Sequence, residues 1–430
     1  MAAAASTRTD DTRAGVAIAS AAIGGNDEAL AAAARLLLDR RTECVRPFLV
    51  EQAGRIARLC HRMAERFARG GRLIAFGQSA AAQSDVRHIA VEFVHPVIVG
   101  KRALPAIGLG VSGGAFARQI ALLARPEDII VAFPGELPDQ SLEPVCNDTV
   151  AAMAAARRIG CLTMSFTQAA AEWEFVHSGD APFLTQEIDE TLYHVLWELV
   201  HVFFEHKGLL DGGGGVRHNA GASSFLYPFL GHEEQNLEQV ITDVRNSIIA
   251  KTDEITTLRQ EMFAASSSAL CAAARTLRSA FENDGTLLVL GNGGSATDAM
   301  DAAADYRFPS LGLQPRPVLD LTEDAAILTA IANDIGADAI FVRQIIAYAR
   351  PGDVVMAFST SGNSRNVTEA LSEAKRRKLA TIAFVGYDGG EIAARQLADH
   401  LISVPSQYIP RIQEAQATAH HIIRELVERA

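Results

Sequence analysis

The 430-residue sequence contains one ordered set of segments twice, and this internal repeat constrains the fold more than any other feature. The segment FARQIALLARPEDIIVAF at 116–133 aligns with FVRQIIAYARPGDVVMAF at 341–358, with Phe, Arg, Gln, Ala, Arg, Pro and Asp in register. Two more pairs occur in the same order: GRLIAFG (71–77) with GTLLVLG (285–291), and QEIDETLYH (186–194) with QEAQATAHH (413–421). Three matches in one order indicate a tandem duplication, so the chain should form the same fold twice.

Each copy opens with a long amphipathic helical stretch, at about 27–69 and about 232–283, and then alternates strand and helix patterns. The strand runs DIIVAF, DVVMAF and TIAFVG are continuously apolar, which is typical of parallel strands that helices cover on both faces. The pattern predicts an α/β protein with two doubly wound, flavodoxin-like parallel-sheet domains in tandem.

The domain boundaries follow from composition. Residues 1–25 are rich in Ala, Thr and Asp and are expected to form a flexible tail. The first domain is assigned to 26–208 and the second to 232–430. Between them, residues 209–231 include four consecutive glycines and are expected to be a linker.

Composition and charge exclude several classes of partner. The net charge is −12, from 39 basic and 51 acidic residues, whereas a nucleic-acid surface would need clustered Lys and Arg. No run of about 18 uncharged apolar residues suggests a membrane span, and the N-terminus has no signal-peptide pattern. The five cysteines form no CxxC pair. These features predict a cytoplasmic protein that binds neither nucleic acid nor membrane.

A cluster of hydroxyl side chains follows the apolar run VVMAF in the second copy. Ser359, Thr360, Ser361 and Ser364 lie where a strand should turn into a helix, and Gly362 allows a tight turn. Ligands of open α/β sheets bind at this edge, where helix N-termini present unpaired N–H groups. A helix cap would need only one hydroxyl. Four hydroxyls beside backbone donors therefore predict a phosphate site that uses no lysine.

A second glycine turn, GNGGS at 291–295, also follows a strand, and it matches neither a GxGxxG fingerprint nor a P-loop. No nucleotide cofactor is expected. The motifs GNGGSATDAM, IANDIGADAIFVRQ, FSTSGNSRNV, VGYDGG and RIQEAQATAHHII together resemble the sugar isomerase (SIS) domain, and specifically the phosphoheptose isomerases, over almost all of 232–430. The first copy resembles the same domain more distantly. The resemblance implies sugar-phosphate contacts for Asn292, Gly293, Gly294, Ser295, Asn333, Asp334, Ser359, Thr360, Ser361, Ser364, Gln413 and His421.

In that family a His and a Glu four residues apart follow the GNGGS turn, and a Gln and a His eight apart lie on a later helix. The Glu acts as base, the last His is its acid–base partner, and in some members all four hold a zinc ion. The second copy departs from this pattern, because Asp301 and Asp305 stand where the first His and Glu belong. Asp is one methylene shorter than Glu, and a misplacement of about 1 Å can cost on the order of 100-fold in rate.

The first copy keeps what the second lost. His88 and Glu92 are four apart, and Gln186 and His194 are eight apart, so the resemblance implies a zinc site from these four and catalytic roles for Glu92 and His194. Its phosphate loop, however, is lost: Pro134, Gly135, Glu136 and Asp139 align with Ser359, Thr360, Ser361 and Ser364. Two carboxylates there would repel a dianion. We therefore expect one composite active site built from both copies. The alternative is that the first copy is a worn structural repeat.

The resemblance implies an aldose–ketose isomerase acting on a phosphorylated sugar through an enediol. Sedoheptulose 7-phosphate to D-glycero-heptose 7-phosphate is the leading reaction, supplying activated heptose for a glycoconjugate or secondary metabolite. A non-catalytic SIS protein that binds sugar phosphate and associates with a replication initiator is the alternative, and a sugar-phosphate lyase or aminosugar isomerase is a third. The family's tetramer of SIS domains implies a homodimer of this chain, with four SIS domains.

Overall fold

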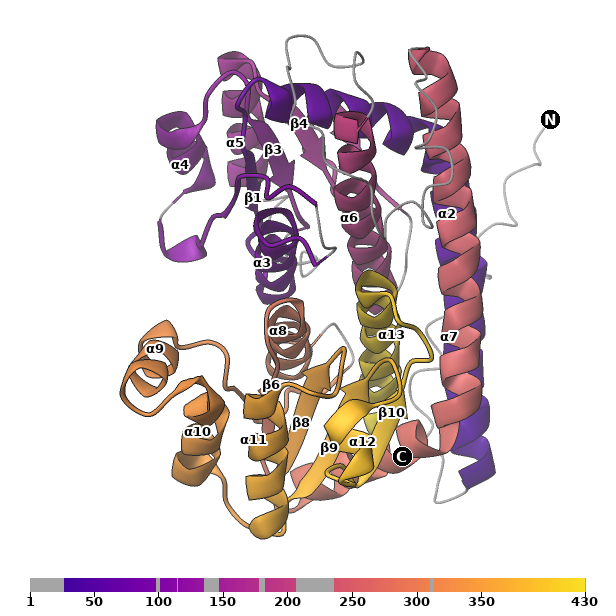
Figure 1. Cartoon of the computed structure of the whole chain (residues 1–430), viewed down its shortest axis with the longest axis vertical. Helices are drawn as coiled ribbons and strands as arrows, with labels where there is room; N and C mark the ends of the chain where they lie inside the picture. The colour runs from indigo at the N-terminus through magenta and orange to yellow at the C-terminus, as the bar shows by residue number, and fades with distance from the viewer. Residues whose placement is uncertain are drawn as a thin grey trace, which may run out of the picture.

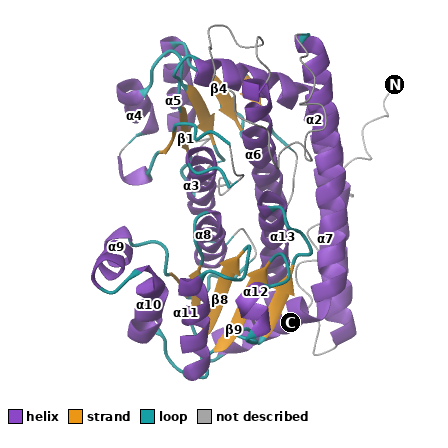
Figure 2. Cartoon of the chain, in the orientation of Figure 1, coloured by secondary structure: helices purple, strands orange, loops and turns teal. Residues whose placement is uncertain are grey.

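The computed structural model describes residues 27–97, 101–113, 115–134, 147–177, 182–205, 236–309 and 313–429. Within them, two five-stranded parallel sheets are stacked along the longest axis of the molecule (Figure 1). Helices cover the sheets and run between them (Figure 2). The predicted α/β fold with two doubly wound sheets in tandem is confirmed. The predicted tail, linker and part of the first copy's phosphate loop lie outside the described residues.

The first sheet has the strand order β2-β1-β3-β4-β5, and every pair in it is parallel. The three central strands, β1, β3 and β4, are fully buried, whereas the edge strands β2 and β5 are partly exposed. The strands are β1 (Leu73–Phe76), β2 (Ala106–Gly108), β3 (Ile129–Ala132), β4 (Leu162–Ser165) and β5 (Trp173–Glu174). The helices are α2 (Asp27–Ala68), α3 (Ala80–Val94), α4 (Phe116–Leu123), α5 (Asn147–Ile159) and α6 (Pro182–Glu205).

The second sheet repeats this arrangement strand for strand, in the order β7-β6-β8-β9-β10, as expected of a duplication. The strands are β6 (Leu287–Leu290), β7 (Val318–Asp320), β8 (Val354–Ser359), β9 (Ala380–Val385) and β10 (His400–Ser403). The helices are α7 (Leu237–Glu282), α8 (Gly294–Arg307), α9 (Ala325–Asp334), α10 (Ile340–Tyr348), α11 (Arg365–Arg376), α12 (Gly390–Ala394) and α13 (Ile409–Val427). This strand order is that of flavodoxin-like folds, which bind ligands at the carboxyl ends of the strands.

The two longest helices each belong to both hydrophobic cores. α2 and α7 pack against each other along the side of the molecule (Figure 1). The early part of α2, including Leu30 and Leu38, packs in the core of the second sheet, and its later part in the core of the first. Conversely, Val240 and Ile248 near the start of α7 pack in the first core. The apolar stripes predicted on these helices are thus covered within one chain.

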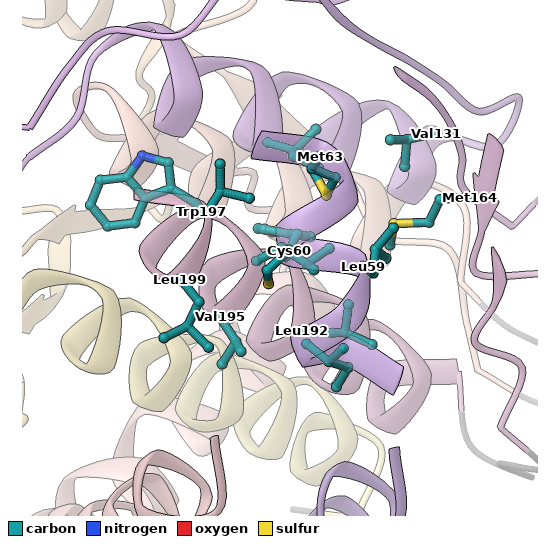
Figure 3. Close-up of a cluster of buried hydrophobic side chains, with 14 of the residues drawn as sticks. Leu59, Cys60, Met63, Val131, Met164, Leu192, Val195, Trp197 and Leu199 are labelled. Carbon is teal, nitrogen blue, oxygen red and sulfur yellow. The ribbon is translucent and has the colours of Figure 1, made fainter. Parts of the chain in front are cut away.

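Figure 3 shows how α2 and α6 join over the first sheet. Cys60 and Met63 of α2 lie among Leu192 and Trp197 of α6, and Met164 of β4 closes the cluster from the sheet. These side chains are fully buried, and burying one such side chain stabilises the folded state by roughly 1.5–3 kcal/mol. The packing fixes α6 and therefore the polar residues on its other side.

The two halves meet through equivalent helices. α3 packs against α8, and α6 packs against α13, near the middle of the molecule (Figure 1). α3 begins at an N-cap Ser79, whose hydroxyl accepts a hydrogen bond from the Ala82 N–H. α8 begins after Gly293, which has a φ of +57° that favours glycine. All the sequence-predicted catalytic and metal-binding positions lie on these four helices.

Candidate active site

One cluster of buried polar side chains takes residues from both halves, and we name it the composite cluster: His88, Glu92, His194 and Gln413. His88 Nε2 lies 3.3 Å from His194 Nε2 and 3.2 Å from the amide nitrogen of Gln413. Glu92 Oε1 lies 3.9 Å from His88 Nε2. Each of the four side chains is at most 3% exposed. Residues from α3, α6 and α13 therefore converge on one point at the interface between the halves.

A second cluster occupies the equivalent position on the other side of the interface, and we name it the reciprocal cluster: Gln186, Asp301, Asp305, His420 and His421. The Gln186 amide donates to Asp301 Oδ1. His421 Nε2 lies 3.2 Å from Asp301 Oδ2 and 3.4 Å from Asp305 Oδ2. All five side chains are buried.

The two glutamines are exchanged between the halves, which corrects the grouping expected from the sequence. The expected metal set joined Gln186 to His88, Glu92 and His194, whereas the structure places Gln186 against Asp301. Gln413 takes its place beside His88. His421, expected among the substrate contacts, lies in the reciprocal cluster. The family pattern of His, Glu, Gln and His is thus complete in the composite cluster, with its Gln from the second half.

His194 and its repeat equivalent His421 are each oriented by a carboxylate from the opposite half. His194 Nδ1 lies 3.1 Å from Glu414 Oε1, and His421 Nδ1 lies 2.9 Å from Glu187 Oε1. A carboxylate accepts the Nδ1–H, so the Nε2 lone pair of each imidazole faces its cluster. The sequence analysis missed Glu187 and Glu414, although the shared Gln-Glu dipeptide of the two repeats was a visible signal.

Burial sets the charge states of the composite cluster. It raises the pKa of the Glu92 carboxyl to about 7; nearby His194 lowers that pKa and Glu198 raises it. Burial, with the neighbouring His194, lowers the pKa of His88 well below its ordinary value. His88 therefore stays neutral near pH 7. Glu92 is poised to exchange a proton in the same range, as a general base requires.

Two histidines of the composite cluster could hold a zinc ion together with Glu190 of α6. One ligand atom of each of His88, Glu190 and His194 lies within 4.8 Å of the others, whereas Glu92, expected from the sequence as a ligand, is not part of this set. Four-coordinate zinc binds His nitrogens at about 2.0–2.1 Å in a tetrahedron, which puts two ligand nitrogens roughly 3.3 Å apart. His88 Nε2 and His194 Nε2 have this spacing. Glu92 Oε2 and Gln413 Oε1 are buried and without a hydrogen-bond partner among the described residues, so each has an oxygen free to bind a cation. His88 Nδ1 lies 3.0 Å from the Tyr193 hydroxyl, which leaves Nε2 to face the cluster.

The hydroxyl-rich loop forms a tight turn at the carboxyl end of β8. Gly362 has a φ of +66°, and its N–H donates to Ser359 Oγ at 3.1 Å. The Asn363 N–H donates to Ser361 Oγ at 3.2 Å. Ser364 is the N-cap residue of α11, yet its hydroxyl caps no backbone N–H of that helix. The loop keeps hydroxyls and N–H groups together at a helix start, where an anion is favoured.

The GNGGS turn connects this loop to the composite cluster. Asn292 and Asn366 exchange two amide hydrogen bonds of 2.8 Å, which ties the turn to the start of α11. Gly294 lies so close to Gln413 that a Cβ there would overlap the Gln413 amide nitrogen, and it would lie 3.2 Å from His88 Nε2. The turn of the second half thus lies next to His88 of the first. It is bonded to the start of α11 on one side and packs against the composite cluster on the other.

The remaining predicted contacts are placed as follows. Ser295 is buried in the first turn of α8, next to Gly294. Asn333 and Asp334 lie at the exposed end of α9, where the Asn333 amide donates to Asp334. In the first half, Pro134 follows β3, while the aligned positions 135, 136 and 139 lie outside the described residues. The predicted loss of that phosphate loop therefore still depends on the sequence.

Comparison with known proteins gives a domain match in the second half of the chain. Residues 252–386 match the family model of the SIS domain. The chain is 52% identical to the phosphoheptose isomerase of Geobacter sulfurreducens over 147 residues, 33% of this chain and 75% of that protein. It is 42% identical to the phosphoheptose isomerase of Citrifermentans bemidjiense over 192 residues, 44% of this chain and 96% of that protein. The chain belongs to the phosphoheptose isomerase family. It is thereby an isomerase built on SIS domains.

Solved structures extend the likeness to the whole chain. The tagatose-6-phosphate ketose/aldose isomerase from Escherichia coli has a TM-score of 0.52 at 12% identity, over 95% of this chain and 94% of that one. The C-terminal domain of glucosamine-fructose-6-phosphate aminotransferase from Francisella tularensis has a TM-score of 0.51 at 10% identity, over 91% of this chain and 94% of that one. At these identities the likeness shows the fold alone. Among the described helices, none is both long and apolar enough to span a membrane.

Proposed function

We propose that the chain isomerises a phosphorylated ketose to the aldose at one composite site per chain. The leading reaction is conversion of sedoheptulose 7-phosphate to D-glycero-heptose 7-phosphate, the type of substrate named for its relatives. The observation that carries the proposal is the contact of Gln413 from the second half with His88 of the first half, next to Gly294. This contact supports a site that combines the hydroxyl-rich loop of the second half with the His–Glu–His set of the first.

The phosphate would bind in the loop from Ser359 to Ser364. There the hydroxyls of Ser359, Thr360, Ser361 and Ser364 and the N–H groups at the start of α11 would donate to its oxygens. Binding a distant phosphate fixes the position of the sugar, so binding energy is used to orient the reacting carbons. No lysine is required, because the helix N-terminus supplies positive potential.

The chemistry moves one proton between adjacent carbons. Glu92 would remove the proton from C1 of the ketose, giving an enediol, and return it to C2, giving the aldose. His194 would move the other proton from the C1 hydroxyl to the C2 oxygen. Its Nε2 faces the cluster because Nδ1 is bonded to Glu414. When a zinc ion is bound by the composite cluster, it supplies Lewis-acid polarisation of the carbonyl oxygen.

A pair of equivalent substitutions tests the proposal. Glu92→Gln should lower turnover of sedoheptulose 7-phosphate by about 100- to 10,000-fold, the usual contribution of a general base, while sugar-phosphate binding is retained. Asp305→Asn, the equivalent change in the second half, should lower it by far less. Turnover is measured as aldoheptose phosphate formed, with and without added zinc. If Asp305→Asn abolishes turnover and Glu92→Gln does not, the composite site is wrong.

A result in which wild-type protein binds the sugar phosphate but never turns it over would favour the alternative function. The replacement of the second half's His and Glu by Asp301 and Asp305 is the observation behind that alternative. The chain would then be a regulatory SIS protein. A cytoplasmic location is part of the proposal, since activated-heptose synthesis uses phosphorylated metabolites.

A further inference from the structure

The reciprocal cluster contains a second set of metal-type donors, different from the family's His, Glu, Gln and His. Asp301 and Asp305 come from α8, and His420 and His421 come from α13. One ligand atom from each lies within 4.8 Å of the others, and all four side chains are buried. None of them has a role in the function proposed above.

The distances between these atoms are those of ligands that share an ion. His420 Nε2 and His421 Nε2 each lie 3.2 Å from Asp301 Oδ2, and His421 Nε2 lies 3.4 Å from Asp305 Oδ2. Zinc–nitrogen and zinc–oxygen bonds of about 2.0–2.2 Å put tetrahedral ligand atoms roughly 3.3–3.5 Å apart. Both ring nitrogens of His420, and Asp305 Oδ2, are buried without an aligned hydrogen bond in the described part of the chain. Their contacts within the protein are therefore short but poorly aligned, and an ion placed between these groups would replace them.

Neighbouring side chains orient the donors as in metal sites. His421 Nδ1 bonds Glu187, and Glu187 in turn accepts from Arg41 at 2.8 Å and from the Thr418 hydroxyl at 2.6 Å. This arrangement directs His421 Nε2 toward the aspartates. The ring of Phe183 stacks on His421 with centroids 4.9 Å apart. The orientation of the His421 imidazole is therefore set by the protein and does not require a bound ion.

The local charge favours a divalent cation. Glu187 is neutralised by Arg41 and lies 3.8 Å from Arg259. Asp301 and Asp305 receive no such arginine among the described contacts, because Arg424 donates instead to the Asp305 carbonyl oxygen and pairs with Glu428. Both carboxylates face His421, and without an ion only a protonated imidazole would pair with these buried charges. One divalent ion would balance the two negative charges while both imidazoles stay neutral.

We propose that Asp301, Asp305, His420 and His421 hold one zinc ion in a closed structural site. Four protein ligands complete a tetrahedron and leave no position for substrate, which is the pattern of structural rather than catalytic zinc. Through Glu187 and Gln186, both from α6, the site would join the second half to the first. The chain would thus have one catalytic site and one structural zinc site that stabilises the interface between its halves.

The test measures metal content in a background that lacks the composite cluster. Full-length His88→Ala protein is loaded with zinc, passed through a desalting column, and assayed for zinc by mass spectrometry. We expect about one zinc per chain and a higher thermal unfolding midpoint than after chelation. Adding His420→Gln should abolish both. Adding His400→Gln, whose imidazole in the edge strand β10 bonds Thr276 of α7, should change neither.

Three outcomes would overturn the proposal. The first is a His88→Ala protein that retains no zinc, in which case a protonated His421 paired with the aspartates balances their charge. The second is a His88→Ala/His420→Gln protein that retains as much zinc as its parent. The third is a His400→Gln effect equal to that of His420→Gln. Cobalt(II) in place of zinc provides an independent readout, since its visible spectrum should report a tetrahedral site only while His420 is present.

Discussion

Gly294→Ala is the substitution that most directly tests whether the two halves share one site. Gly294 is the first residue of α8, and its backbone conformation is open to alanine. The added Cβ would overlap the Gln413 amide nitrogen and lie 3.1 Å from the Gln413 Cδ. Ordinary contact needs about 3.5 Å, so the amide must move by more than about 1 Å. It would then leave its position beside His88.

The expected effect separates function from stability. A displacement of about 1 Å in a catalytic set can cost on the order of 100-fold, so kcat/KM should fall by about that factor, or roughly 2.7 kcal/mol of transition-state stabilisation. The free energy of unfolding should change little, because the end of a flexible side chain can rotate and alanine is a good helix residue. Gly54→Ala in α2, where the nearest atom is 3.9 Å away, is the matched control.

A double-mutant cycle identifies the cause. If the added methyl group acts by moving the Gln413 amide, Gly294→Ala with Gln413→Ala should be little worse than Gln413→Ala alone. Assays use sedoheptulose 7-phosphate, with thermal unfolding measured on the same samples. Wild-type kcat/KM in Gly294→Ala, or losses that simply add in the double mutant, would refute the shared site.

Three further predictions concern binding, pH and assembly. Ser359→Ala with Ser361→Ala should weaken sugar-phosphate binding by at least about 10-fold, since a hydrogen bond to a charged group contributes about 1.5–3 kcal/mol; an equal loss from Glu136→Ala with Asp139→Ala would contradict this. In chelated protein, burial raises the Glu92 pKa to about 7 from 4.5, so its contribution to stability is complete below about pH 4.5 and is lost as the pH rises to about 7. Denaturant titrations should show a shallower loss over that range in Glu92→Gln, and identical slopes would disprove it. Light scattering should give about twice the 45.9 kDa chain mass, because α9 is apolar yet has no buried residue; a monomer would refute the dimer.

The fold could be predicted well because the pattern of apolar residues and the internal repeat can both be read directly from the sequence. Continuous apolar runs such as residues 354–358 identify buried parallel strands, and the duplication requires two of each element. The contact of polar residues from the two halves was also expected from the sequence, since the hydroxyls near Ser361 and the pair His88 and Glu92 survive in different copies. Aligning the two copies shows directly which functional side chains each copy has kept and which it has lost.

The exchange of Gln186 and Gln413 could not be predicted in the same way. An eight-residue spacing puts Gln186 and His194 on one face of α6, but it does not say which helix that face meets. In the structure α3 packs against α8 and α6 packs against α13, so Gln186 of α6 reaches Asp301 on α8 and Gln413 of α13 reaches His88 on α3. The apolar stripe of α2 likewise does not indicate which core its early turns join. Tertiary packing determines that they join the second.

The sharing of α2 and α7 between the two cores sets an order on folding during synthesis. The core of the first sheet includes Val240 and Ile248, which leave the ribosome only after the linker. Leu30 and Leu38 are made early, yet their partners on α7 and α13 come at the end of the chain. The first half must therefore wait for residues beyond its own boundary, and its apolar surfaces stay exposed to chaperones meanwhile. The first half can close only after about residue 249 has been made, and the second half, whose core includes Val427, only when translation is nearly complete.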